Sequence, residues 1–126
     1  MNAKTSLFLI AAVLASACKK NTGNTPQPSV WGTWELRATK GGNILPAVYP
    51  AGNGNLVKFT QGSYAAYSSG SLVTQGTYQS SSDSNTETLT FKSGNFTSET
   101  GTVLLDTLKI KPFNPEIATS YYVKIP

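Results

Sequence analysis

The side chains that most often carry out chemistry in proteins are scarce in this sequence. Its 126 residues include no histidine and a single cysteine, Cys18. A chain without histidine has neither a Ser-His-Asp triad nor a Cys-His pair, and it lacks the commonest metal ligand. The six acidic residues are scattered and form no spaced calcium-binding loop. We therefore predict that the protein is not an enzyme and that it binds no metal and no cofactor.

Cys18 stands at the end of a stretch with the layout of an export signal. Met1 to Ser6 is polar with one cation, Leu7 to Ala17 is an uncharged apolar run of eleven residues, and small residues precede the cysteine. A transmembrane helix needs about 20 apolar residues, so the run predicts a cleaved signal peptide. A lone cysteine in an exported chain has no partner for an internal disulfide, and attachment of lipid would account for it. A plain signal peptide with an incidental cysteine is the alternative.

The residues Leu14-Ala15-Ser16-Ala17-Cys18 resemble the lipobox of bacterial lipoproteins. The resemblance implies that residues 1–17 are removed and that Cys18 becomes the first residue, carrying acyl chains such as palmitate. The membrane is then a partner of the protein through this lipid. Lys19 and Lys20 follow the cysteine, and no acidic surface-export signal is present. We therefore expect a place in the cell envelope, on the periplasmic face of the outer membrane of a Gram-negative bacterium.

The rest of the chain divides into a polar segment and one small domain. Residues 18–30 hold the lipidated cysteine and the sequence KKNTGNTPQPSV, whose prolines and lack of apolar periodicity are typical of a flexible linker. Residues 31–126 are long enough for one domain. Without Lys4, nine basic residues stand against six acidic ones, a net charge of +3. The basic residues of the domain are scattered, so no nucleic-acid partner is predicted.

Apolar and polar residues alternate throughout the domain, which is the period of half-buried β-strands. In the first run, Trp34, Leu36 and Ala38 fall on one face, and Glu35 and Arg37 fall on the other. No stretch has helical spacing. The predicted runs are Thr33 to Thr39, Asn55 to Thr60, Ser63 to Tyr67, Leu72 to Gln79, Thr86 to Lys92, Thr102 to Lys111 and Tyr121 to Ile125.

Short turns between these runs, such as the hairpin expected at Gln61-Gly62, favour antiparallel pairing in chain order. The predicted fold is all-β: a small antiparallel up-and-down β-barrel of seven to eight strands, after the signal peptide and the linker. A closed antiparallel ring needs an even number of strands. Either the barrel has an open seam, or a further strand lies at Ile44-Leu45, Val48-Tyr49 or Asn95-Phe96-Thr97.

The longest run, Thr102 to Lys111, contains one conflict. Leu104, Leu108 and Ile110 share a face with Asp106. Either this carboxylate faces the interior and needs a donor, or a bulge at Leu104-Leu105 shifts the register. We expect the bulge, because an unpaired buried carboxylate is costly.

Gly32-Thr33-Trp34 opens the first run, and Gly62-Ser63-Tyr64 and Gly76-Thr77-Tyr78 repeat the Gly-x-aromatic step. With the up-and-down order of runs, this is similar to the Gly-x-Trp start of the lipocalin family, in the form of the short lipocalin-like domains found on bacterial lipoproteins. The resemblance implies that Trp34 packs across the closed end of a barrel, where Gly32 lets the chain turn in tightly. It also implies that the barrel carries a small apolar or amphipathic ligand.

The long segment from Lys40 to Gly54 joins the first two runs. In lipocalins the corresponding loop is a lid, so the resemblance implies that Ile44, Leu45, Val48 and Tyr49 contact a ligand at the mouth of the barrel. The alternative is that these residues cap a filled interior, and we favour it because small barrels are usually filled by their own side chains.

Two functions remain open from the sequence. One is a membrane-anchored binding module for a small apolar or amphipathic ligand. The other is an envelope interaction protein with a filled barrel, which binds a protein or glycan through its outer surface or its loops. A cavity lined by apolar side chains would favour the first, and a packed interior would favour the second.

Overall fold

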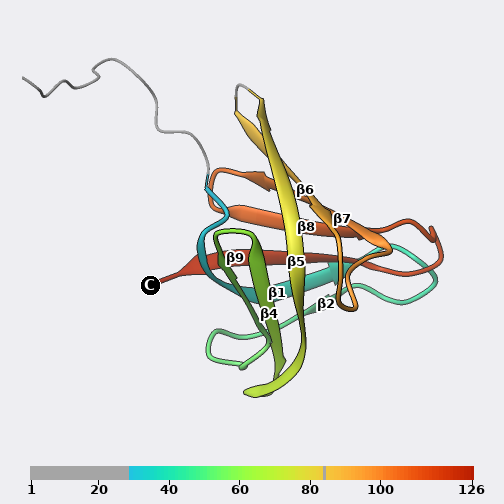
Figure 1. Cartoon of the computed structure of the whole chain (residues 1–126). Helices are drawn as coiled ribbons and strands as arrows, with labels where there is room; N and C mark the ends of the chain where they lie inside the picture. The colour runs from blue at the N-terminus through green and yellow to red at the C-terminus, as the bar shows by residue number, and fades with distance from the viewer. Residues whose placement is uncertain (1–28, 84) are drawn as a thin grey trace, which may run out of the picture.

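The computed structural model describes residues 29–83 and 85–126, which form nine β-strands and no helix (Figure 1). The predicted signal peptide, Cys18 and the linker up to Pro28 lie outside the described residues. Within the described residues, no helix is long and apolar enough to cross a membrane. The strands are β1 (Gly32–Lys40), β2 (Ala47–Val48), β3 (Leu56–Thr60), β4 (Ser63–Ser68), β5 (Ser71–Asp83), β6 (Thr86–Phe91), β7 (Glu99–Leu104), β8 (Thr107–Pro112) and β9 (Thr119–Ile125).

Eight of the nine described strands close into a barrel. From β3 to β9 each strand pairs antiparallel with the next, and β1 pairs with both β3 and β9, which closes the ring. β2 is an addition to the edge of β1, where Val48 pairs with Ala38. The prediction of an all-β antiparallel up-and-down barrel is confirmed. None of the three candidates for a further strand supplies the eighth. Ile44-Leu45 lies outside the strands, Val48 lies in β2, which is outside the ring, and residues 95–97 form a turn.

The eighth strand of the ring comes from the run Thr102 to Lys111, which was expected to be a single strand. It divides into β7 and β8 at a two-residue turn, Leu105-Asp106, with Leu104 opposite Thr107. The expected bulge is therefore wrong, and Asp106 is exposed in the turn, where its carboxylate needs no buried donor. Leu105 has a φ of 58°, in the left-handed region that leucine rarely adopts.

A bulge does occur in β1, at Arg37. Leu36 pairs with Tyr122, whereas Ala38 pairs with Tyr121, so the register against β9 shifts by one residue between them. Neighbouring residues of β9 face opposite sides of the sheet, and directly paired residues share a face. Leu36 therefore faces the interior and Ala38 the exterior. The prediction that Trp34, Leu36 and Ala38 share one face is wrong beyond Leu36, because the bulge reverses the alternation.

The interior of the barrel holds a core of buried apolar side chains. Aromatic rings fill the side formed by β3 to β6: Phe59 packs edge-on against Tyr78 with centroids 5.2 Å apart, and Tyr64 stacks on Phe96 at 5.1 Å. The two tyrosine hydroxyls donate to backbone carbonyls at 2.6 Å, so neither is buried without a partner. The buried apolar residues are Val30, Trp34, Val57, Phe59, Tyr64, Ala66, Tyr78, Leu89, Phe91, Val103, Leu108 and Ile110.

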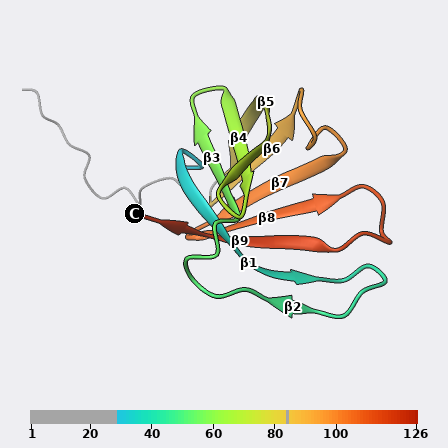
Figure 2. The ribbon, with the colours of Figure 1, turned by 90° about the horizontal axis from the view of Figure 1, so that it is seen from below.

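Strand direction gives the barrel two different ends (Figures 1 and 2). The described chain starts at Ser29 and ends at Pro126 on one side, together with the turns after β3, β5 and β7; we call this the terminal end. The opposite side, the loop end, carries the turn after β4 and the loops after β1, β6 and β8. In Figure 2 the hairpin of β1 and β2 extends away from the terminal end.

Candidate functional site

The terminal end of the barrel is closed by the first described residues. Val30 is fully buried, although the sequence places it in the linker, so the core begins one residue before the predicted domain boundary. Its N–H donates to Glu87 Oε1 at 3.0 Å, and its carbonyl accepts from Trp34 Nε1 at 2.7 Å. Trp34 is 0% exposed, as expected for a residue packed across the closed end. These two hydrogen bonds satisfy the buried backbone atoms of Val30, whose side chain fills this end of the barrel and excludes water from it.

Gly32 fits this closure through its backbone. Its φ is 128°, a conformation that favours glycine, and a Cβ there would lie 2.8 Å from Lys124 Cε. The Lys124 ammonium lies 5.5 Å from the centre of the Trp34 ring and donates to the Ser29 carbonyl at 3.1 Å. The lysine therefore covers the tryptophan and joins the last strand to the first described residue.

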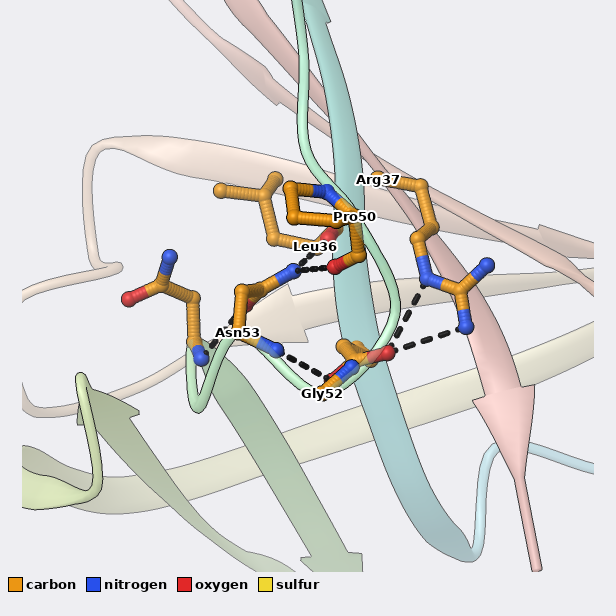
Figure 3. A network of polar contacts seen from close by, with 7 residues as sticks. Leu36, Arg37, Pro50, Gly52 and Asn53 are labelled. Carbon is orange, nitrogen blue, oxygen red and sulfur yellow. Dashed lines mark hydrogen bonds and ion pairs between the residues drawn. The ribbon is translucent and has the colours of Figure 1, made fainter.

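Glu35 lies at the centre of a polar network on the outer face of β1, and Figure 3 shows its neighbours Arg37, Gly52 and Asn53. Its carboxylate accepts from the N–H groups of Gly52 at 2.8 Å and Asn53 at 3.1 Å, and it pairs with the Arg37 guanidinium at 2.9 Å. The segment between β2 and β3 leaves the edge of β1 and folds over this carboxylate, so Glu35 is only 3% exposed. The Asn53 side chain adds bonds to the carbonyls of Leu36 and Pro50. The sequence placed Glu35 and Arg37 on one face correctly but gave no sign of this burial.

The network fixes the ionisation of Glu35. Burial raises the pKa of this carboxyl, but the hydrogen bonds from Arg37, Gly52 and Asn53 outweigh that effect and hold the pKa below its ordinary value. The pKa of Glu35 is lower in the folded protein than in the unfolded chain, where a glutamate has a pKa of about 4.3. The network therefore stabilises the fold at pH values above that pKa, and this contribution is lost as the pH falls through the folded pKa.

We therefore expect the segment over Glu35 to open in acid. The amide NMR shifts of Gly52 and Asn53 should stay constant from neutral pH down to about pH 4.3 and move below it, as the carboxylate takes up a proton. In Glu35→Gln, which cannot ionise, the same amides should show no such titration. An identical acid transition in Glu35→Gln would mean that another group controls the segment.

The four predicted contact residues lie on the loop between β1 and β3. Leu45 is 86% exposed, and Ile44 and Val48 are also exposed, whereas Tyr49 is partly buried and its N–H donates to the Arg37 carbonyl at 2.9 Å. Val48 belongs to β2 on the outer edge of β1, away from the interior. The structure thus brings Ile44 and Leu45 together at the loop end and places Val48 and Tyr49 along the side of the barrel.

The sequence did not predict the partner of this loop, the connection between β8 and β9. Asn43 donates from its backbone N–H to the Glu116 carbonyl at 3.1 Å and from its side chain to Glu116 Oε1 at 3.0 Å. Gly42 packs so closely that a Cβ would lie 2.6 Å from the Glu116 carbonyl oxygen. These contacts hold the two loops together, and the exposed apolar side chains that the loops carry are called the loop-end patch: Ile44, Leu45, Phe113 and Ile117.

A small hollow of about 240 Å³ lies beside this patch, lined by Asn95, Ser98, Glu99, Pro112, Asn114 and Ile117. Burial raises the pKa of the Glu99 carboxyl. Burial and the negative charge of Glu99 raise the pKa of Tyr122, on the neighbouring inner wall, to about 12. Pockets for drug-sized ligands usually have about 300–1,000 Å³, so this hollow is below that range.

A larger groove of about 590 Å³ lies on the outer wall. Thr102, Lys109 and Tyr121 form a cross-strand row on β7, β8 and β9, and their neighbours Val103, Leu108 and Tyr122 face the interior. The groove is therefore outside the barrel. It continues along the β7–β8 turn and is lined by Thr102, Leu104, Leu105, Asp106, Thr107, Lys109 and Tyr121.

The described residues contain six acidic side chains and no histidine or cysteine. Among them no group of three His, Cys, Asp or Glu side chains could hold a metal ion. The two buried carboxylates, Glu35 and Glu87, both accept hydrogen bonds that hold the fold together. No protein-family model matches this chain, and no curated protein or solved structure matches it significantly.

Proposed function

We propose that this protein is a lipid-anchored envelope lipoprotein whose barrel is an interaction module that binds another protein through the loop-end patch. The observation that carries the proposal is the packed interior. A barrel that carries a small apolar ligand inside needs a cavity for it. A barrel filled by its own side chains has only its walls and loops for recognition.

Burial supports the filled interior directly. A side chain that lined a water-sized cavity would keep accessible surface toward it. Trp34, Leu89, Val103 and Leu108 are all 0% exposed, although they come from four different strands around the ring. No space that could hold a water molecule therefore touches these side chains, and the hollow beside Glu99 is small. This favours the interaction protein over a lipocalin-like carrier of a small apolar or amphipathic ligand.

The chemistry of the loop-end patch favours a protein partner over a glycan. Three of its four members, Ile44, Leu45 and Ile117, are aliphatic, whereas sugars stack on aromatic faces. The hydrogen bonds between Asn43 and Glu116 hold the two loops in one arrangement. A patch that is already ordered loses less conformational entropy on binding. Exposed apolar residues grouped at one end of a small domain commonly mark an interaction site.

The position of the patch also suits an anchored protein. A lipid on Cys18 would hold the chain at the terminal end, where Ser29 enters the barrel. The loops with the patch are at the opposite end, so they would face away from the membrane. On the periplasmic face of an outer membrane, the patch would then meet proteins of the envelope.

The test is cross-linking in the protein's own host. A photo-reactive amino acid at position 45 should yield a discrete cross-linked protein, because Leu45 is at the exposed tip of the patch. The double change Ile44→Ser and Ile117→Ser should reduce that yield about tenfold or more, since each removes apolar surface worth roughly 1 kcal/mol or more. Stability should change by less than about 0.5 kcal/mol for each exposed site.

Two controls make the result specific. The same photo-reactive group at position 72 probes another exposed apolar residue, in β5, and should yield no discrete product. Native mass spectrometry of protein purified from its host should show no retained small molecule. Retention of an apolar ligand that Val48→Ser and Tyr49→Ser release would overturn the proposal in favour of the carrier.

A further inference from the structure

The β7–β8 turn has an unusual composition for its shape. Leu105 is 74% exposed, and its φ of 58° lies in the left-handed region, where glycine and asparagine are normally found. Leu104 beside it is 50% exposed. A leucine in the left-handed region costs stability, and its exposed side chain gains no burial that would offset this cost, so the outlier points to a function.

The turn is next to the place where the chain enters the barrel. The Asp106 carbonyl accepts from the Lys124 N–H at 3.4 Å, and the Lys124 ammonium donates to the Ser29 carbonyl at 3.1 Å. Figure 1 shows the first described residues and the C-terminus at this same end of the molecule. Trp31, also exposed, follows two residues after Ser29. Any segment that leads from Ser29 to a membrane therefore starts at the same end of the barrel as the β7–β8 turn.

The local charge is compatible with a bacterial membrane surface. Lys109 lines the groove next to the turn, and Lys124 is adjacent; the acidic residues at this end are Asp106, the buried Glu87 and Asp83 at the tip of the β5–β6 hairpin. Anionic headgroups attract nearby basic residues. Exposed tryptophan is enriched at membrane–water interfaces, where its ring meets both apolar chains and polar headgroups.

We propose that the β7–β8 turn is a membrane contact, in which Leu104 and Leu105 insert into the surface of a phospholipid bilayer. The proposal rests on the proposed lipid anchor for its orientation: the terminal end faces the bilayer to which Cys18 is attached. It adds a second attachment that sets the direction of the barrel, with the loop-end patch pointing away from the membrane.

Attachment of the chain to the membrane through Cys18 makes a weak contact of the turn effective. Eleven residues, Lys19 to Ser29, separate the cysteine from the barrel, and a chain of that length spans at most about 40 Å. The turn is therefore confined close to the bilayer, and its insertion becomes an intramolecular step with a high effective concentration. Two leucines can hold an orientation under these conditions, although they would bind free vesicles weakly.

The experiment uses the chain from residue 18 onward with Cys18→Ser, so that no lipid and no leader contribute to binding. Flotation with vesicles of phosphatidylethanolamine and phosphatidylglycerol should show weak partition of this chain. Leu105→Asn should weaken partition roughly tenfold, because it removes one inserted leucine. Asparagine tolerates the left-handed conformation, so the melting temperature should be unchanged or higher. The matched control, Leu72→Asn at the loop end, should leave partition unchanged.

Three results would overturn the proposal: no partition of the parent chain at millimolar lipid, equal partition of all variants, or partition that appears only after residues 19–28 are deleted. The last result would mean that the chain's own linker occupies the groove. Because the chain tested has no lipid, these outcomes do not depend on whether Cys18 is acylated or on what the loop-end patch binds. Whether Cys18 is acylated, and whether the loop-end patch binds a protein, are tested separately by the experiments in the host.

Discussion

Replacing Trp34 with alanine is expected to unfold the barrel or to destabilise it by about 3–5 kcal/mol, the usual cost of removing a buried aromatic side chain. Small domains have about 5–15 kcal/mol of stability in total, so the loss is a large share of it. The indole fills the closed end, accounts for the hydrogen bond to the Val30 carbonyl, and supports the Lys124 ammonium. Removing it leaves a cavity. It also removes the hydrogen bond that holds Val30 in place at this end of the barrel, so water can enter there.

The other tryptophan of the chain provides the control. Trp31 is about half exposed and its side chain hydrogen-bonds to Tyr78, so its replacement by alanine should cost clearly less stability than the loss of the fully buried Trp34. Urea denaturation followed by circular dichroism measures both variants on the same scale. Equal midpoints for Trp34→Ala and Trp31→Ala would contradict the assignment of Trp34 as the residue that closes the barrel.

The fold class was predictable because antiparallel strands with one face in a core alternate with period two. The division of residues 102–111 was not. The inward residues on either side of the turn are Val103 and Leu108, which are directly paired. They are five positions apart, an odd number, so the alternation changes phase across the turn. The turn itself, Leu105-Asp106, lacks the glycine that usually marks a two-residue hairpin. Without that mark, the run has the length and composition of a single strand.

The candidate site was only partly predictable for a similar reason. The exposed apolar centre of the first long loop indicated Ile44 and Leu45 from local composition. Their partner loop was not indicated, because Asn43 and Glu116 are 73 positions apart in the chain. The burial of Glu35 likewise depends on a segment 17 and 18 positions away, which folds back over β1. The first contact depends on the pairing of β1 with β9 and the second on the fold of a loop, and neither leaves a periodic trace in the sequence.

Loss of the lipid anchor should have the largest effect on where the protein is found. Cys18→Ser is expected to move the protein from the membrane fraction to the fraction without membranes, or to leave it as an unprocessed precursor with residues 1–17 attached. Each buried methylene of an acyl chain contributes about 0.8 kcal/mol, so two or more chains hold a protein firmly. Fractionation and intact-mass measurement of the protein from its host distinguish mature, acylated and precursor forms.

The neighbouring change Lys19→Ser is the control, since it alters the same region without removing the thiol, and it should leave the protein in the membrane fraction. A Cys18→Ser protein that is mature and still bound firmly to membranes would contradict the lipoprotein proposal. Weak residual binding has a different meaning. It should disappear in the double variant Cys18→Ser and Leu105→Asn, because the β7–β8 turn is the second proposed contact. The acyl chains would then determine whether the protein is at the membrane, and the turn would determine which end of the barrel faces it.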